Sequence, residues 1–159
     1  MEELTEEEAV EEVDEFSKEF VHNLIDKIMM FMEVFIGHPL HEYQQPLARR
    51  VIESVIINDG EEITALAARQ SGKTEIIAST IATLMVILPQ LALVFPDLLG
   101  KFKDGVMIGV FAPVEGQVET LFGRTVNFLT SEHAKSILKD PDIDDEPTKP
   151  SGVVRTLRD

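Results

Sequence analysis

The residues best suited to chemistry are Ser71, Gly72, Lys73 and Thr74, which follow an apolar run and precede a long helical pattern. Glycine has no Cβ, so the backbone at Gly72 can come close to a phosphate oxygen. Amides at the start of a helix point at such an anion, and the helix dipole adds positive potential there. The Lys73 ammonium can reach the β- and γ-phosphates, and the Thr74 hydroxyl can bind Mg²⁺. The stretch 68–74 therefore predicts a phosphate-binding loop.

The elements around this loop have the order that such a loop requires. Residues 63–67 predict a buried strand before it, and residues 75–88 predict a helix after it, without Gly or Pro in its interior. The usual pattern is Gly, four residues, then Gly-Lys-Ser/Thr. Ala67 stands at the first glycine position, so the match is incomplete. An ordinary strand-to-helix turn is the alternative interpretation.

Helices and strands alternate along the rest of the chain. Residues 1–36 predict one helix, which Gly37 and Pro39 end. The other predicted elements, in chain order, are a helix at 45–57, a turn at 58–60, a strand at 106–111, a helix at 115–129 and a strand beginning at 152–159. This order indicates an α/β fold of the P-loop NTPase type, with a mainly parallel sheet and helices on both faces. The predicted division is an acidic helix at 1–36 and part of an ATPase domain at 37–159.

The helix at 1–36 carries an apolar stripe with a period of 3.6 residues. An acidic face lies opposite the stripe, which consists of Val10, Val13, Phe16, Phe20, Leu24, Ile28, Met32 and Phe35. The stripe either docks on another subunit or packs on its own domain. We favour the second interpretation, because most amphipathic helices pack within their own domain.

The composition excludes several classes of protein. The 159 residues include no Cys, which excludes disulfides and thiolate sites and fits a reducing, cytoplasmic compartment. An acidic N-terminus does not predict a signal peptide, and the longest apolar run is broken by Pro89-Gln90, so no membrane span is expected. The net charge is −15, and residues 1–36 hold 12 acidic against 2 basic residues. This balance argues against a stand-alone DNA-binding module, although a motor could contact DNA through a few loops.

The segment Arg69-Gln70-Ser71-Gly72-Lys73-Thr74 resembles the divergent phosphate loop of the large terminase subunits, the ATP-driven motors that package DNA into tailed bacteriophages. Loops of that family often carry an Arg before Gly-Lys-Ser/Thr and often lack the first glycine, as here. Tyr43-Gln44 stands where the family has an adenine-contacting glutamine. Residues 111–117 resemble the segment after the family's second strand, with Ala-Pro and a later Gln. The resemblance covers about residues 36–159.

The resemblance implies a role for each matching residue. Gln44 would hydrogen-bond the adenine of ATP, with Tyr43 packing nearby. Gln70, Ser71, Gly72, Lys73 and Thr74 would hold the phosphates, with Thr74 on Mg²⁺. Arg69 would act with Lys73 in catalysis, as a sensor or charge stabiliser near the γ-phosphate. The alternatives are a salt bridge for Arg69, a polar residue at a helix start for Gln44, and an exposed helix residue for Gln117.

Partners follow from the same resemblance. Double-stranded DNA, the small terminase subunit and the portal are implied, a homo-oligomer is allowed, and the implied location is the cytoplasm of the host cell. A complete motor also needs an Asp-Glu pair after a later apolar strand, to hold Mg²⁺ and to orient water. That pair and the family's nuclease domain are missing.

We therefore expect the N-terminal part of a terminase, which binds ATP weakly, hydrolyses little on its own, and is marginally stable or self-associates. The alternatives are a fragment of a helicase-type motor and a non-catalytic protein that binds a partner through its acidic helix.

Overall fold

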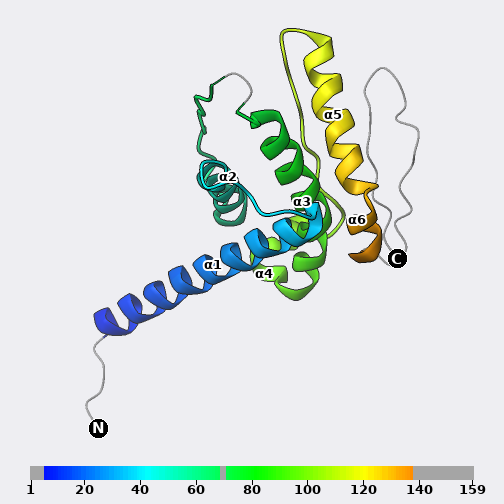
Figure 1. The fold of residues 1–159 in the computed structure, drawn as a ribbon. Helices are drawn as coiled ribbons and strands as arrows, with labels where there is room; N and C mark the ends of the chain where they lie inside the picture. Colours follow the sequence, from blue (N-terminus) through cyan, green and yellow to red (C-terminus); the bar gives the residue numbers. More distant parts are fainter. Residues whose placement is uncertain (1–5, 69–70, 138–159) are drawn as a thin grey trace.

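The structure, a computed structural model, describes residues 6–68 and 71–137, with side chains described from Ser17 onward. Helices account for all the regular structure in these residues (Figure 1). They are α1 (Glu6–Ile36), α2 (Gln45–Ile57), α3 (Lys73–Val94), α4 (Pro96–Leu99), the 3₁₀ helix η1 (Gly100–Phe102), α5 (Glu115–Leu129) and α6 (Glu132–Ile137).

The predicted α/β fold with a parallel sheet is wrong for the described part of the chain. Residues 63–67 and 106–111 lie outside any helix or strand, and no backbone hydrogen bond between described residues involves either segment. A strand exists only when its N–H and C=O groups pair with a neighbour. The side chains of Leu66, Met107 and Phe111 are 98%, 99% and 93% exposed, so neither segment is the buried strand that was expected. The strand predicted from residue 152 lies outside the described residues.

Helix α3 lies at the centre of the molecule, where α1, α2, α4 and α5 all contact it (Figure 1). Small buried residues, among them Ala78, Ser79 and Ala82, allow these neighbours to approach closely. Among the described residues, α3 is the one helix long and apolar enough to cross a membrane. However, 61% of its apolar window is buried inside the molecule, as in the core helix of a soluble protein.

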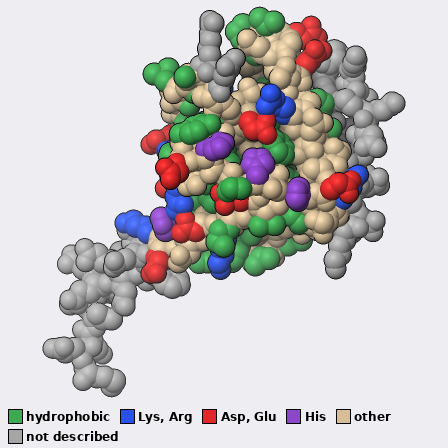
Figure 2. Space-filling view, in the orientation of Figure 1, with side chains coloured by type: hydrophobic (Ala, Val, Ile, Leu, Met, Phe, Trp, Pro, Cys, Tyr) green, Lys and Arg blue, Asp and Glu red, His purple; other side chains and the backbone are tan. Residues whose placement is uncertain are grey.

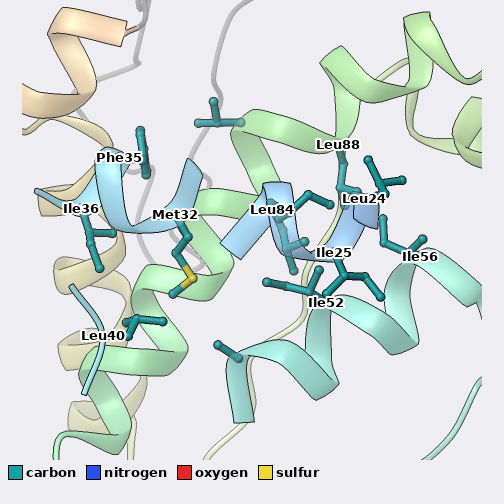
Figure 3. Close-up of a cluster of buried hydrophobic side chains, with 14 of the residues drawn as sticks. Leu24, Ile25, Met32, Phe35, Ile36, Leu40, Ile52, Ile56, Leu84 and Leu88 are labelled. Carbon is teal, nitrogen blue, oxygen red and sulfur yellow. The ribbon is translucent and has the colours of Figure 1, made fainter. Parts of the chain in front are cut away.

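The second half of α1 supplies much of the core. Leu24, Ile28, Met32 and Phe35 recur at the predicted spacing and are buried. Figure 3 shows Leu24, Met32 and Phe35 of this stripe together with Ile52 and Ile56 of α2 and with Leu84 and Leu88 of α3. The prediction that α1 packs on its own domain is confirmed for these residues. The side chains at 10, 13 and 16, which belong to the same predicted stripe, lie outside the description.

The boundaries of most helices agree with the sequence prediction. Helices α2 and α5 have the predicted bounds, and α2 ends where Asn58 adopts the left-handed conformation, with φ at 60°. Helix α3 differs, because it continues through Pro89 to Val94 instead of ending near Leu88. Proline removes one helical hydrogen bond. Burial of α3 on several sides, Pro89 and Ala92 included, offsets that loss.

A groove with a volume of about 460 Å³ lies between α2 and α3. Its walls are mainly apolar and include Val51 and Val55 of α2, Ile77 and Ile81 of α3, and residues 106–108. The exposed segment 106–111 therefore begins along a groove instead of joining a sheet.

Candidate functional site

The backbone bends sharply at Gly72, directly before α3. Gly72 is the N-cap of this helix, with φ at 70° and ψ at 18°. A residue with a side chain is strained at such a positive φ, so the bend favours glycine. The Ile76 N–H donates to the Gly72 carbonyl at 3.0 Å, which closes the first turn. The N–H groups of residues 73–75 come before this first bond and have no acceptor inside the helix. They are therefore available to an anion.

Gln44 and Tyr43 lie against this bend, although they are far from it in sequence. A Cβ atom on Gly72 would come within 2.9 Å of Gln44 Nε2 and 3.7 Å of Tyr43 Oη. Gln44 is only 6% exposed, and its Oε1 accepts a hydrogen bond from the His41 N–H at 3.1 Å. The Tyr43 ring is exposed and stacks on the His41 ring, with centroids 5.5 Å apart. The structure thus brings together three of the residues that the sequence singled out.

The polar groups of the loop remain available for a ligand. The Ser71 hydroxyl is shielded from solvent and has no hydrogen-bond partner in the described structure. Lys73 is exposed and makes no ion pair with a described residue, and Thr74 beside it is half-buried. Arg69 and Gln70, which were predicted to act on the phosphates, lie outside the described residues. A glycine bend, an unpaired hydroxyl and a lysine fit the phosphates of a nucleotide.

Glu75 follows Thr74 directly and forms an ion pair with α5. The Arg124 Nη1 donates to Glu75 Oε2 at 2.5 Å, and both side chains are partly exposed. Sequence analysis missed this pair, because 49 residues separate its members and neither carries a local signal. Sequence analysis also missed the hydrogen bond from the His41 N–H to Gln44. A spacing of three residues just before a helix is the local signal that could have predicted it.

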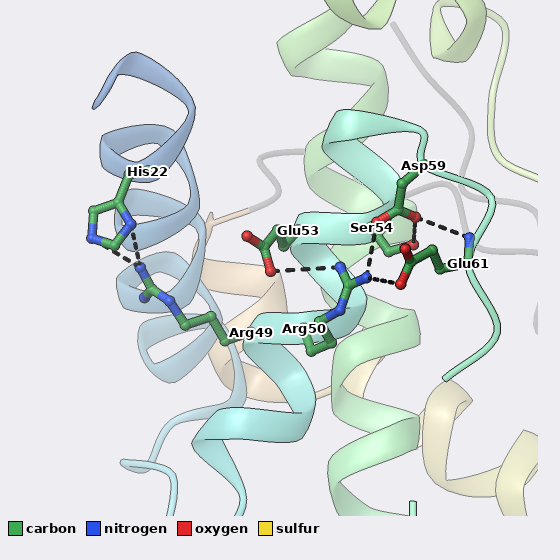
Figure 4. Close-up of polar contacts among 7 residues, drawn as sticks. All are labelled: His22, Arg49, Arg50, Glu53, Ser54, Asp59 and Glu61. Atoms are coloured by element: carbon green, nitrogen blue, oxygen red, sulfur yellow. Dashed lines mark hydrogen bonds and ion pairs between the residues drawn. The ribbon is translucent and has the colours of Figure 1, made fainter. Parts of the chain in front are cut away.

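Two arginines of α2 are engaged by neighbouring side chains, and Figure 4 shows Arg49 against His22 and Arg50 among carboxylates. Arg49 donates to Asp26 Oδ1 at 2.6 Å, and this bond lowers the pKa of Asp26. Arg50 donates to Asp59 Oδ2 at 2.9 Å and to Glu61 Oε2 at 3.0 Å. Hydrogen bonds from the Ser54 hydroxyl, the Glu61 N–H and Arg50 lower the pKa of Asp59 to about 2. Neither arginine is a free cation for nucleic acid.

The rest of the described surface adds little to the site. Lys and Arg side chains are scattered singly among acidic and apolar ones on the face in Figure 2, which therefore has no continuous basic surface. The described residues contain no group of three or more His, Asp or Glu side chains that could hold a metal. Gln117 is exposed in the first turn of α5.

Comparison of the chain with protein-family models, with curated proteins and with solved structures found no match. The bend at Gly72 and its contacts with Gln44 and Tyr43 are therefore the features from which a function must be argued.

Proposed function

We propose that the chain binds the triphosphate of ATP at the start of α3. The observation that carries this proposal is the packing of Gln44 and Tyr43 against Gly72, the N-cap of α3. A phosphate at the bend would be held by the free amides of the first turn and by the Lys73 ammonium. The Oε1 of the neighbouring Gln44 already accepts from the His41 N–H, so the Nε2 of its carboxamide would donate to a base edge. Phosphate and base groups would thus bind to adjacent parts of one surface.

Thr74 would supply a hydroxyl to Mg²⁺, which screens the charge of the phosphates and polarises them when bound. Arg69 would stabilise charge near the γ-phosphate. With these groups the chain would be the nucleotide-binding part of a terminase-like motor that packages viral double-stranded DNA in the host cytoplasm, with the small terminase subunit and the portal as partners. What supports this further step is the order of the three sequence segments, 43–44, 69–74 and 111–117.

The main test measures the affinity of the chain for MgATP by isothermal titration calorimetry, with Lys73→Ala as the diagnostic variant. We expect weak binding by the unchanged chain and loss of measurable binding in the variant, because the ammonium supplies the only full positive charge that directly follows the bend.

Lys135→Ala is the matched control. Lys135 is exposed on α6 and pairs with Glu132 at 3.1 Å, so its removal also deletes one positive charge but leaves the bend alone. Affinity in this variant should be unchanged. Equal affinities of the unchanged chain and the Lys73→Ala variant would refute the phosphate site.

A further inference from the structure

The ion pair between Glu75 and Arg124 places a full negative charge in the first turn of α3, directly after Lys73 and Thr74. The positive end of a helix is equivalent to about half an elementary charge. An uncompensated carboxylate there outweighs the helix dipole and repels a phosphate. A positive partner is needed if the first turn is to remain attractive to an anion.

Arg124 is the group that provides this compensation. Its guanidinium lies 2.5 Å from the Glu75 carboxylate and comes from α5, a helix that packs along α3. Arginine remains protonated at any pH at which the protein is folded. We propose that Arg124 is a positioning residue for nucleotide binding, which neutralises Glu75 so that the amides and Lys73 attract the phosphates.

This inference rests on the proposed function, but it makes a separate claim. A structural role of the ion pair would be to join α5 to α3, and this role is lost whichever partner is removed. A compensating role is different, because removal of Arg124 exposes the negative charge whereas removal of Glu75 eliminates it. The two roles therefore predict opposite effects for substitutions of the two partners.

The experiment measures the Kd for MgATP of the unchanged chain, Arg124→Gln, Glu75→Gln and the double variant. We expect Arg124→Gln to weaken binding roughly threefold to tenfold, the effect of one partly screened charge a few ångströms from an anion. Glu75→Gln should bind as tightly as the unchanged chain or more tightly. The double variant should regain the affinity of the unchanged chain, and the loss in Arg124→Gln should shrink at high salt.

Circular dichroism checks that every variant keeps its helices, and Arg124→Lys, which retains the charge, should bind nearly as well as the unchanged chain. Weakening of binding by Glu75→Gln, or a double variant as weak as Arg124→Gln, would overturn the inference and indicate a structural link. If Lys73→Ala abolishes binding while Arg124→Gln has no effect, only this inference fails. If the unchanged chain binds no MgATP, both proposals fail.

Discussion

Gly72 experiences two constraints at once, a backbone angle and a side-chain neighbour. Its φ of 70° disfavours any residue with a Cβ, and that Cβ would meet Gln44 Nε2 at 2.9 Å. We expect Gly72→Ala to lower the free energy of unfolding by about 1–2 kcal/mol, as measured by urea denaturation. Gly123→Ala is the control, because Gly123 lies inside α5 with open space around it. This substitution should raise the free energy of unfolding by about 0.5–1 kcal/mol. Equal effects would show that the bend is not populated in solution.

Asp59 lies in the turn after α2 and makes the stability of the protein depend on pH. Its pKa of about 2 in the folded chain lies below its ordinary value, so folding favours the ionised form. The stabilisation is present above the unfolded pKa of about 3.9 and is lost as the pH falls toward 2. We expect Asp59→Asn to destabilise the protein near neutral pH and to have little effect near pH 2, when urea denaturation is compared across this range. Comparing the two proteins at each pH cancels the titration of the other acids, so a difference that does not change with pH would contradict the assignment.

Helix α1 contributes one face to the core and leaves another in solvent. Phe35 is fully buried, whereas Val34 beside it is mostly exposed. We expect Phe35→Ala to cost about 3–5 kcal/mol in the free energy of unfolding, and Val34→Ala to change it by less than about 0.5 kcal/mol. Urea denaturation measures both. If Phe35→Ala had an equally small effect, α1 would be free to dock elsewhere, as in the alternative of a partner-binding helix.

The helices show what a sequence can predict in this chain. The stripe from Leu24 to Phe35, the turn at 58–60 and the bounds of α2 and α5 follow from local periodicity and turn chemistry. Residues 63–67 and 106–111 show where local information ends, because an apolar run does not specify which backbone it will pair with. The same limit applies to Glu75 and Arg124, whose meeting depends on how α5 packs on α3. The approach of Gln44 to Gly72 was implied only by the resemblance of separate segments to one family.

The charge of the whole molecule is strongly negative, at −15. Phosphate groups are repelled by such a field at long range, so the binding that we propose at α3 would depend on local positive groups and on Mg²⁺. Arg49 and Arg50 are engaged by carboxylates and add little to the attraction. This balance is consistent with the weak ATP binding that we propose, and it gives the compensation of Glu75 by Arg124 more importance than it would have in a basic protein.

The described surface also exposes apolar groups that water does not solvate well. Met107 and Phe111 project from a segment whose backbone has no hydrogen-bond partner among the described residues, beside the groove between α2 and α3. Exposed apolar patches and unpaired extended backbone both promote association. We therefore expect the chain to self-associate with increasing concentration in sedimentation velocity experiments, and Met107→Ser/Phe111→Ser to weaken that association.

Met30→Ser/Val34→Ser is the matched control for this comparison. Both residues are exposed and apolar, but they lie on α1, where the helix satisfies the backbone. Loss of exposed apolar surface there should leave association nearly unchanged, because no unpaired backbone accompanies it. If both double variants weaken association equally, general hydrophobicity drives it and the segment 106–111 has no special role. A chain that stays monomeric at every concentration would show that the exposed apolar residues of the described surface do not promote association.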